Sequence, residues 1–132
     1  KNAKEKGIDD RIFFHGYTQD VKSAYRNADI NAFPSVSEGF ALGLADGMAH
    51  GLPSIGFATT SSVNEMIRDG ENGFLVNSVD EFAEKLALLI KDKDLRIRLG
   101  KQAVQDMKPY APENIMDAWD NLIKETIAPY QK

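Results

Sequence analysis

The chain has 132 residues, no cysteine, two histidines and a formal net charge of -4 at neutral pH. This length is enough for one domain with its own core, and we treat residues 1–132 as such a domain. The acidic balance without a basic stripe argues against nucleic-acid binding. The missing cysteines exclude a disulfide framework and a thiolate zinc site, and no apolar run approaches the roughly 20 residues of a transmembrane segment.

The first part of the chain predicts a short helix and a strand. Charged residues 1–6 favour a helix, which Gly7 is well placed to end. Residues 11–15 (Arg-Ile-Phe-Phe-His) then predict a strand, followed by a turn at Gly16 and Tyr17. We interpret the histidine at position 15 as a structural residue at a strand end.

The next segment predicts a helix followed by a second strand. Asp20 is placed to cap a helix over residues 21–28, with Tyr25 on its apolar side as a core residue. Residues 30–33 predict a strand that ends at Pro34, because proline removes a ladder donor and restricts the preceding residue.

The stretch 34–53 predicts a turn and a helix that begins near Gly39. The first amides of such a helix lack partners inside the helix and carry the positive end of its dipole. They can therefore bind a phosphate or a sugar hydroxyl. Glu38 stands beside these donors.

Eight residues separate Glu38 from Asp46, a rise of roughly 12 Å along a helix. That distance can span much of a nucleotide-sugar. In the plainer alternative, Glu38 is a solvated carboxylate of the first turn and Asp46 a surface residue. Against it, Asp46 sits among apolar neighbours, where a carboxylate requires a partner.

The second half predicts two more strands, a turn and four helices. The strands are residues 54–57 and 74–76, and residues 69–73 form the turn between a short helix and the second of them. The expected helices cover 63–67, a segment capped by Asp80 that includes 82–90, and then 95–107 and 113–127. We place Trp119, on the apolar side of the last helix, in the core.

Strands that alternate with helices predict an α/β fold with a parallel sheet. In open parallel sheets ligands bind beyond the carboxyl ends of the strands, here residues 15–17, 34–40 and 58–62. We divide the chain into a βα core over 1–78 and C-terminal helices over 79–132.

The stretch from Ser35 to Pro53 resembles the signature of retaining GT-B glycosyltransferases, the "glycosyl transferases group 1" family. The likeness extends over about the first two thirds of the chain. It includes His15-Gly16, Tyr25 with Ala28-Asp29-Ile30, Asn64-Glu65 and Asp69-Gly70 with Asn72-Gly73.

The resemblance implies a donor site for a nucleotide-sugar. Glu38, with the amides of Gly39, Phe40 and Ala41, would bind the donor sugar. The nucleotide would be bound by Asp46 at the ribose, by the backbone at Leu42 near the diphosphate, and by Gly16 and Tyr17 beside the base. No metal, cofactor or catalytic nucleophile is implied. Asp46 departs from the family's glutamate by one methylene.

The resemblance also implies that the chain is part of a Rossmann-like C-terminal domain without its first two strands. These would lie between residues 11–14 and 30–33. The chain would lack the N-terminal domain and the first strand-helix unit, whose Arg and Lys grip the diphosphate, and no Lys or Arg occurs between Pro34 and Arg68. We therefore expect exposed strand edges, self-association or a rearranged sheet, and no activity of the chain alone.

The implied function is transfer of a sugar from a nucleotide diphosphate sugar, which we expect to be UDP-linked, with retention. The resemblance implies a cytoplasmic protein, peripheral at the membrane at most. Two alternatives stay open at this point: a sugar-nucleotide epimerase or phosphorylase of the same architecture, and a non-enzymatic interaction module.

Overall fold

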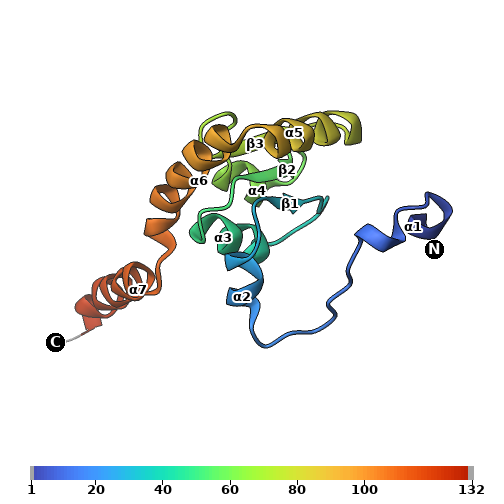
Figure 1. The fold of residues 1–132 in the computed structure, drawn as a ribbon. Coiled ribbons are helices and arrows are strands. Elements are labelled where there is room, and N and C mark those ends of the chain that lie inside the picture. The colour runs from blue at the N-terminus through green and yellow to red at the C-terminus, as the bar shows by residue number, and fades with distance from the viewer. Residues whose placement is uncertain (1, 131–132) are drawn as a thin grey trace.

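A computed structural model describes residues 2–130 of the chain (Figure 1). The two ends of the chain are helical, and strands alternate with helices in the part between these ends. In chain order these are α1 (Asn2–Glu5), η1 (Asp9–Arg11), α2 (Val21–Arg26), β1 (Asn31–Phe33), α3 (Leu42–Ala49), β2 (Ser54–Phe57), α4 (Ser61–Met66), β3 (Gly73–Val76), α5 (Val79–Lys91), α6 (Lys93–Met107), η2 (Lys108–Tyr110), α7 (Pro112–Ile127) and η3 (Ala128–Tyr130).

The three strands form one parallel sheet in the order β1-β2-β3. Ser54 lies between Asn31 on one side and Gly73 on the other, so the strands start level with one another. Since α3 joins β1 to β2 and α4 joins β2 to β3, the predicted α/β class with a parallel sheet is confirmed.

Each face of the sheet carries its own core. On one face α3, α4 and the end of α6 pack together through Ala41, Leu44, Met48, Val63, Met66, Ile67, Ala103 and Met107, with Phe33 and Leu75 beside them. On the other face Leu89 of α5 and Leu99 of α6 pack against Ile55, Phe74 and Val76 of the sheet. Alternate residues of β3 thus point to opposite faces, as the two-residue period of a strand requires.

The strand expected at residues 11–15 is not present. Residues 9–11 form the short helical turn η1, and residues 12–16 have no regular structure. Phe13 is 76% exposed and Phe14 89% exposed. A strand is stabilised by hydrogen bonds to a neighbouring strand, and no strand within residues 2–130 pairs with this segment, so apolar composition alone does not form one. Phe33, in contrast, packs half-buried against the core on the α3 side.

Four predicted helix starts, those of α3, α4, α5 and α6, are wrong by two or three residues. Residues 39 and 40 form a bend, and α3 begins at Leu42 after an N-cap at Ala41. The cap of α5 is Ser78 instead of Asp80, because the Ser78 hydroxyl accepts a hydrogen bond from the Glu81 amide at 3.1 Å. The predicted cap of α2 is confirmed, since Asp20 accepts from the Ser23 amide at 3.0 Å.

The interpretation of Trp119 as a core residue is also wrong. Helix α7 extends away from the sheet on the side opposite α1 (Figure 1), and its main packing partners are the turns η2 and η3. The Trp119 side chain is 57% exposed. The apolar side of α7 thus lies at the surface, through Ile115, Met116, Trp119, Leu122, Ile123 and Ile127.

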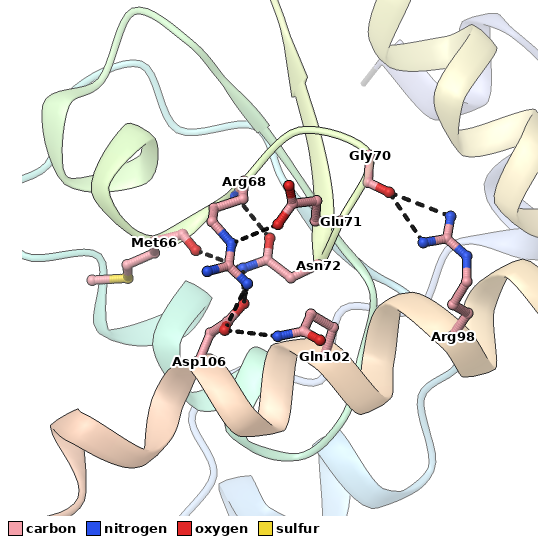
Figure 2. Close-up of polar contacts among 8 residues, drawn as sticks. All are labelled: Met66, Arg68, Gly70, Glu71, Asn72, Arg98, Gln102 and Asp106. Carbon is pink, nitrogen blue, oxygen red and sulfur yellow. Dashed lines mark hydrogen bonds and ion pairs between the residues drawn. The ribbon is translucent and has the colours of Figure 1, made fainter.

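A polar cluster ties the turn before β3 to α6 (Figure 2). The Arg68 guanidinium donates to both carboxylate oxygens of Asp106 at 2.8 Å. The buried Asn72 amide donates to Asp106 at 2.8 Å and to the Met66 carbonyl at 3.0 Å, and accepts from the Arg68 amide at 2.8 Å. The Gln102 side-chain amide also donates to the Asp106 carboxylate, at 2.9 Å. This cluster fixes α6 against the turn.

Candidate functional site

The candidate site lies where β1 and β2 end. The loop after β1, residues 34–41, leads into α3, and the loop after β2 leads into α4. The Thr60 hydroxyl donates to the Ser35 carbonyl at 3.5 Å and so joins the two loops. Parallel strands place both loops on the same edge of the sheet, which is the usual place for a ligand in this architecture.

Four backbone amides at the start of α3 have no acceptor among the described residues, and those of Gly39, Phe40 and Gly43 belong to residues that are at least partly exposed. Within residues 2–130 the amides of Gly39, Phe40, Ala41 and Gly43 donate no hydrogen bond. The Leu42 amide differs, because it donates to the Phe40 carbonyl at 2.8 Å. The amides of residues 44 and 45 both donate to the Ala41 carbonyl, at 3.0 Å each. The free donors lie at the positive end of the helix dipole, where an anion is stabilised.

Glu38 is exposed beside these amides. No hydrogen bond or ion pair of its carboxylate occurs in the part of the chain that the structure describes. The neighbouring Ala41 is fully buried, backbone included, so its amide does not lie at the surface beside Glu38. Phe40 is 47% exposed, and its ring packs on Tyr110 with 5.9 Å between the ring centroids.

Asp46 lies on α3 between two cavities. One has a volume of about 750 Å³. Phe40, Leu42 and Lys108 line it together with mostly apolar residues of α3, α6 and α7. The other has a volume of about 280 Å³ and lies between α3 and the start of α2, with Gln19, Asp20, Val21, Lys22, Tyr25 and His50 around Asp46. Glu38 lines neither cavity.

Asp46 is exposed, so the expectation that burial would force it to find a partner is wrong. Its carboxylate makes no hydrogen bond or ion pair with any residue from 2 to 130. Its charge acts on Tyr25: burial first, and the nearby Asp46 carboxylate second, raise the pKa of the Tyr25 hydroxyl above its ordinary value of 10.0. The carboxylate is therefore available to a ligand on the α2 side.

The remaining predicted site residues, Gly16 and Tyr17, belong to the segment before α2. Gly16 has a φ of 65°, which supports the predicted turn, and Tyr17 is 90% exposed. Neither lines the two cavities beside Asp46. The structure instead brings Gln19 and Lys22 to Asp46, two residues that sequence reasoning missed because only the packing of α2 on α3 places them there. The ligand roles of all these residues stay predictions.

Residues 2–130 contain no group of three or more His, Asp or Glu side chains that could hold a metal ion. No helix in the same range has the length and apolar character needed to cross a bilayer.

Comparisons with known proteins agree with this architecture. An uncharacterized glycosyltransferase of Haemophilus influenzae is 31% identical over 92% of this chain and 35% of its own length. The "UDP-N-acetylglucosamine--peptide N-acetylglucosaminyltransferase GtfA subunit" of Streptococcus gordonii is 29% identical over 95% of this chain and 26% of its own length. The chain thus spans about a third or less of these two relatives.

A solved structure and a family model give the same result. The C-terminal domain of a glycosyl transferase group 1 family protein from Francisella tularensis matches with a TM-score of 0.68 and 31% identity, over 80% of this chain and 56% of that one. The family model described as "Glycosyl transferases group 1" matches residues 1–92. Because that match covers most of the 132 residues, the chain belongs to the glycosyl transferases group 1 family.

Proposed function

We propose that the chain is the donor-binding half of a glycosyltransferase that transfers a sugar from a UDP-linked sugar to an acceptor with retention of the anomeric configuration. The family membership supports transfer of a sugar. The name of the Streptococcus gordonii relative states UDP-N-acetylglucosamine as its donor, which supports a UDP-linked donor here.

One observation carries the proposal. The same helix, α3, has free amides at its start beside Glu38 and, further along, the unpaired Asp46 carboxylate in a small cavity lined mostly by residues with polar groups. A nucleotide-sugar has the matching chemistry, because its diphosphate accepts hydrogen bonds and its ribose hydroxyls donate them. The smaller cavity suits a ribose better than the larger one, whose lining is mostly apolar.

The proposed contacts follow the line of α3. Glu38 accepts hydrogen bonds from hydroxyls of the donor sugar, with the amides of Gly39, Phe40 and Ala41 beside it. Near Leu42 the diphosphate is bound by the Gly43 amide, because the Leu42 amide is already engaged. Asp46 accepts from the ribose, and residues 16 and 17 border the base.

Two lysines lie on the cavities that contain Asp46. Lys22 lines the small cavity and Lys108 the large one. Each can contribute positive charge near a bound diphosphate, although no cation lies between Pro34 and Arg68. We propose that the protein acts mainly by positioning the donor and neutralising the leaving diphosphate, and we assign no nucleophile.

We further propose that residues 1–132 form one partial domain, with the βα core at 1–78 and the helices at 79–132. Its relatives are about three times as long or longer, which supports an additional N-terminal domain as a partner in the same protein. For the chain alone we propose association with a second copy, and light scattering that shows a monomer at micromolar concentration would contradict this.

The experiment that tests the function is the substitution Glu38→Ala in the full-length protein. Loss of the sugar contact should lower the rate of sugar transfer by at least about tenfold, roughly 1.4 kcal/mol, with the fold unchanged by circular dichroism. Glu84→Ala, which removes an exposed carboxylate of α5, is the matched control and should transfer at the original rate. Equal rates for both variants would contradict the role of Glu38.

A further inference from the structure

The carbonyl of Gly43, in the first turn of α3, accepts hydrogen bonds from two side chains of other elements. The Tyr25 hydroxyl of α2 donates at 3.1 Å, and the Asn31 amide of β1 donates at 3.3 Å. The same amide lies 3.4 Å from the Leu44 carbonyl and 3.2 Å from the Ser54 hydroxyl of β2. Both α2 and β1 are therefore hydrogen-bonded to α3 at the Gly43 carbonyl.

The glycines of α3 allow this close contact. A Cβ atom at Gly47 would lie 2.6 Å from Cγ of Asn31, a distance that no side chain tolerates. A Cβ atom at Gly43 would lie 3.5 Å from the Phe33 ring, in ordinary contact. The Asn31 side chain therefore occupies the space directly beside the backbone of α3, where a longer residue on the helix would displace it.

Tyr25 also reaches the far end of α3. Its ring stacks on His50 with 5.2 Å between the ring centroids, and Nδ1 of His50 donates to the Asp46 carbonyl at 2.7 Å. Asp46 therefore lies between two points that Tyr25 contacts, the Gly43 carbonyl and the His50 ring. The Asp46 carboxylate itself has no partner from residues 2–130, so its place depends on the helix that carries it.

We infer that Tyr25 and Asn31 are positioning residues that hold α3 so that Asp46 faces the cavity beside α2. The inference rests on the proposed nucleotide site and adds two residues to it. Neither residue needs to touch the nucleotide. Tyr25 supplies the bond from α2, the helix that forms the other wall of the cavity, and Asn31 supplies the bond from the sheet.

The test is a double-mutant cycle in the full-length protein, with the affinity for UDP measured by calorimetry. Tyr25→Phe keeps the ring and removes only the hydroxyl, and it should weaken UDP binding about fivefold, on the order of one neutral hydrogen bond. Asp46→Ala should also weaken binding. If Tyr25 acts through Asp46, adding Tyr25→Phe to Asp46→Ala should cause no further loss.

Thr126→Val is the matched control. It removes a hydroxyl that donates to a helix carbonyl, at 2.7 Å, on α7 instead of α3. Its UDP affinity should equal that of the unmodified protein. A weakened Thr126→Val variant would show that loss of any such bond has this effect, which would overturn the inference.

The remaining outcomes separate the inference from the proposed function. If Asp46→Ala binds UDP normally, the nucleotide site is wrong and the positioning role falls with it. If Asp46→Ala weakens binding and Tyr25→Phe does not, the site stands and the positioning role is refuted. Fully additive losses would also refute it, because Tyr25 would then act independently of Asp46.

Discussion

Asp106→Ala should destabilise the chain through the cluster that joins the turn before β3 to α6 (Figure 2). The carboxylate accepts from Arg68, Asn72 and Gln102. The Arg68 side chain is 52% exposed and can be rehydrated, so its ion pair contributes at most about 1 kcal/mol. Asn72 is fully buried and would lose one of its two donor bonds, at a cost of roughly 1 to 2 kcal/mol.

Together these terms give a loss of about 2 kcal/mol in the free energy of unfolding. For a chain of this length that corresponds to a decrease of roughly 8 °C in melting temperature. Urea unfolding followed by circular dichroism measures the loss, and Asp117→Ala is the control, because that carboxylate is exposed on α7. Asp106→Asn keeps one acceptor for the Asn72 amide and should lose about half as much. A change below about 0.5 kcal/mol for Asp106→Ala would refute this account of the cluster.

Three shorter predictions concern α3 and its contacts. Asp46→Glu should leave UDP affinity unchanged or increase it, and calorimetry showing a loss of more than about tenfold would indicate a site built around the shorter acid. Gly47→Ala gains about 1 kcal/mol of helix propensity, but the clash with Asn31 costs roughly 1 to 3 kcal/mol. We therefore expect net destabilisation in urea, and no extra loss when the same change is made in an Asn31→Ala background. Because burial and Asp46 raise the pKa of Tyr25, the folded state keeps that proton above pH 10.0, where the unfolded chain loses it. The resulting stability is complete below that pH and falls as the pH rises through the pKa of the folded state. Tyr25→Phe should thus flatten the decline that sets in above pH 10.0, and parallel curves would contradict this.

Elements whose signals are local were predictable from the sequence. Asp20 caps α2 through its own side chain, and residues 54–57 form β2 because a short apolar run between turns can be covered on both faces of a parallel sheet. The turn at residues 69–73 follows from Gly70, whose φ of 74° few other residues adopt.

Features that depend on distant parts of the chain were not predictable. Residues 11–15 have the composition of a strand, but the described part of the chain has no neighbouring strand for them to pair with. Trp119 lies on the apolar side of a helix, and the periodicity that predicts this side does not predict which part of the protein packs against it. Of the candidate site, Glu38 and Asp46 could be named from spacing and resemblance. Lys22 and Lys108 could not, because only tertiary packing brings them to the cavities.

The exposed apolar side of α7 has a consequence for how the chain folds. As far as the structure describes the chain, the cores on both faces of the sheet include no residue after Met107, so α7 adds no buried side chain to either. A single helix of about this length is only marginally helical in water without packing. The helical content of residues 112–127 should therefore increase when another surface packs on their apolar side, while the sheet stays unchanged. Helix α7 would then fold as a unit separate from the rest of the chain, and cutting the chain after Ala111 would remove that unit without taking a side chain from either core.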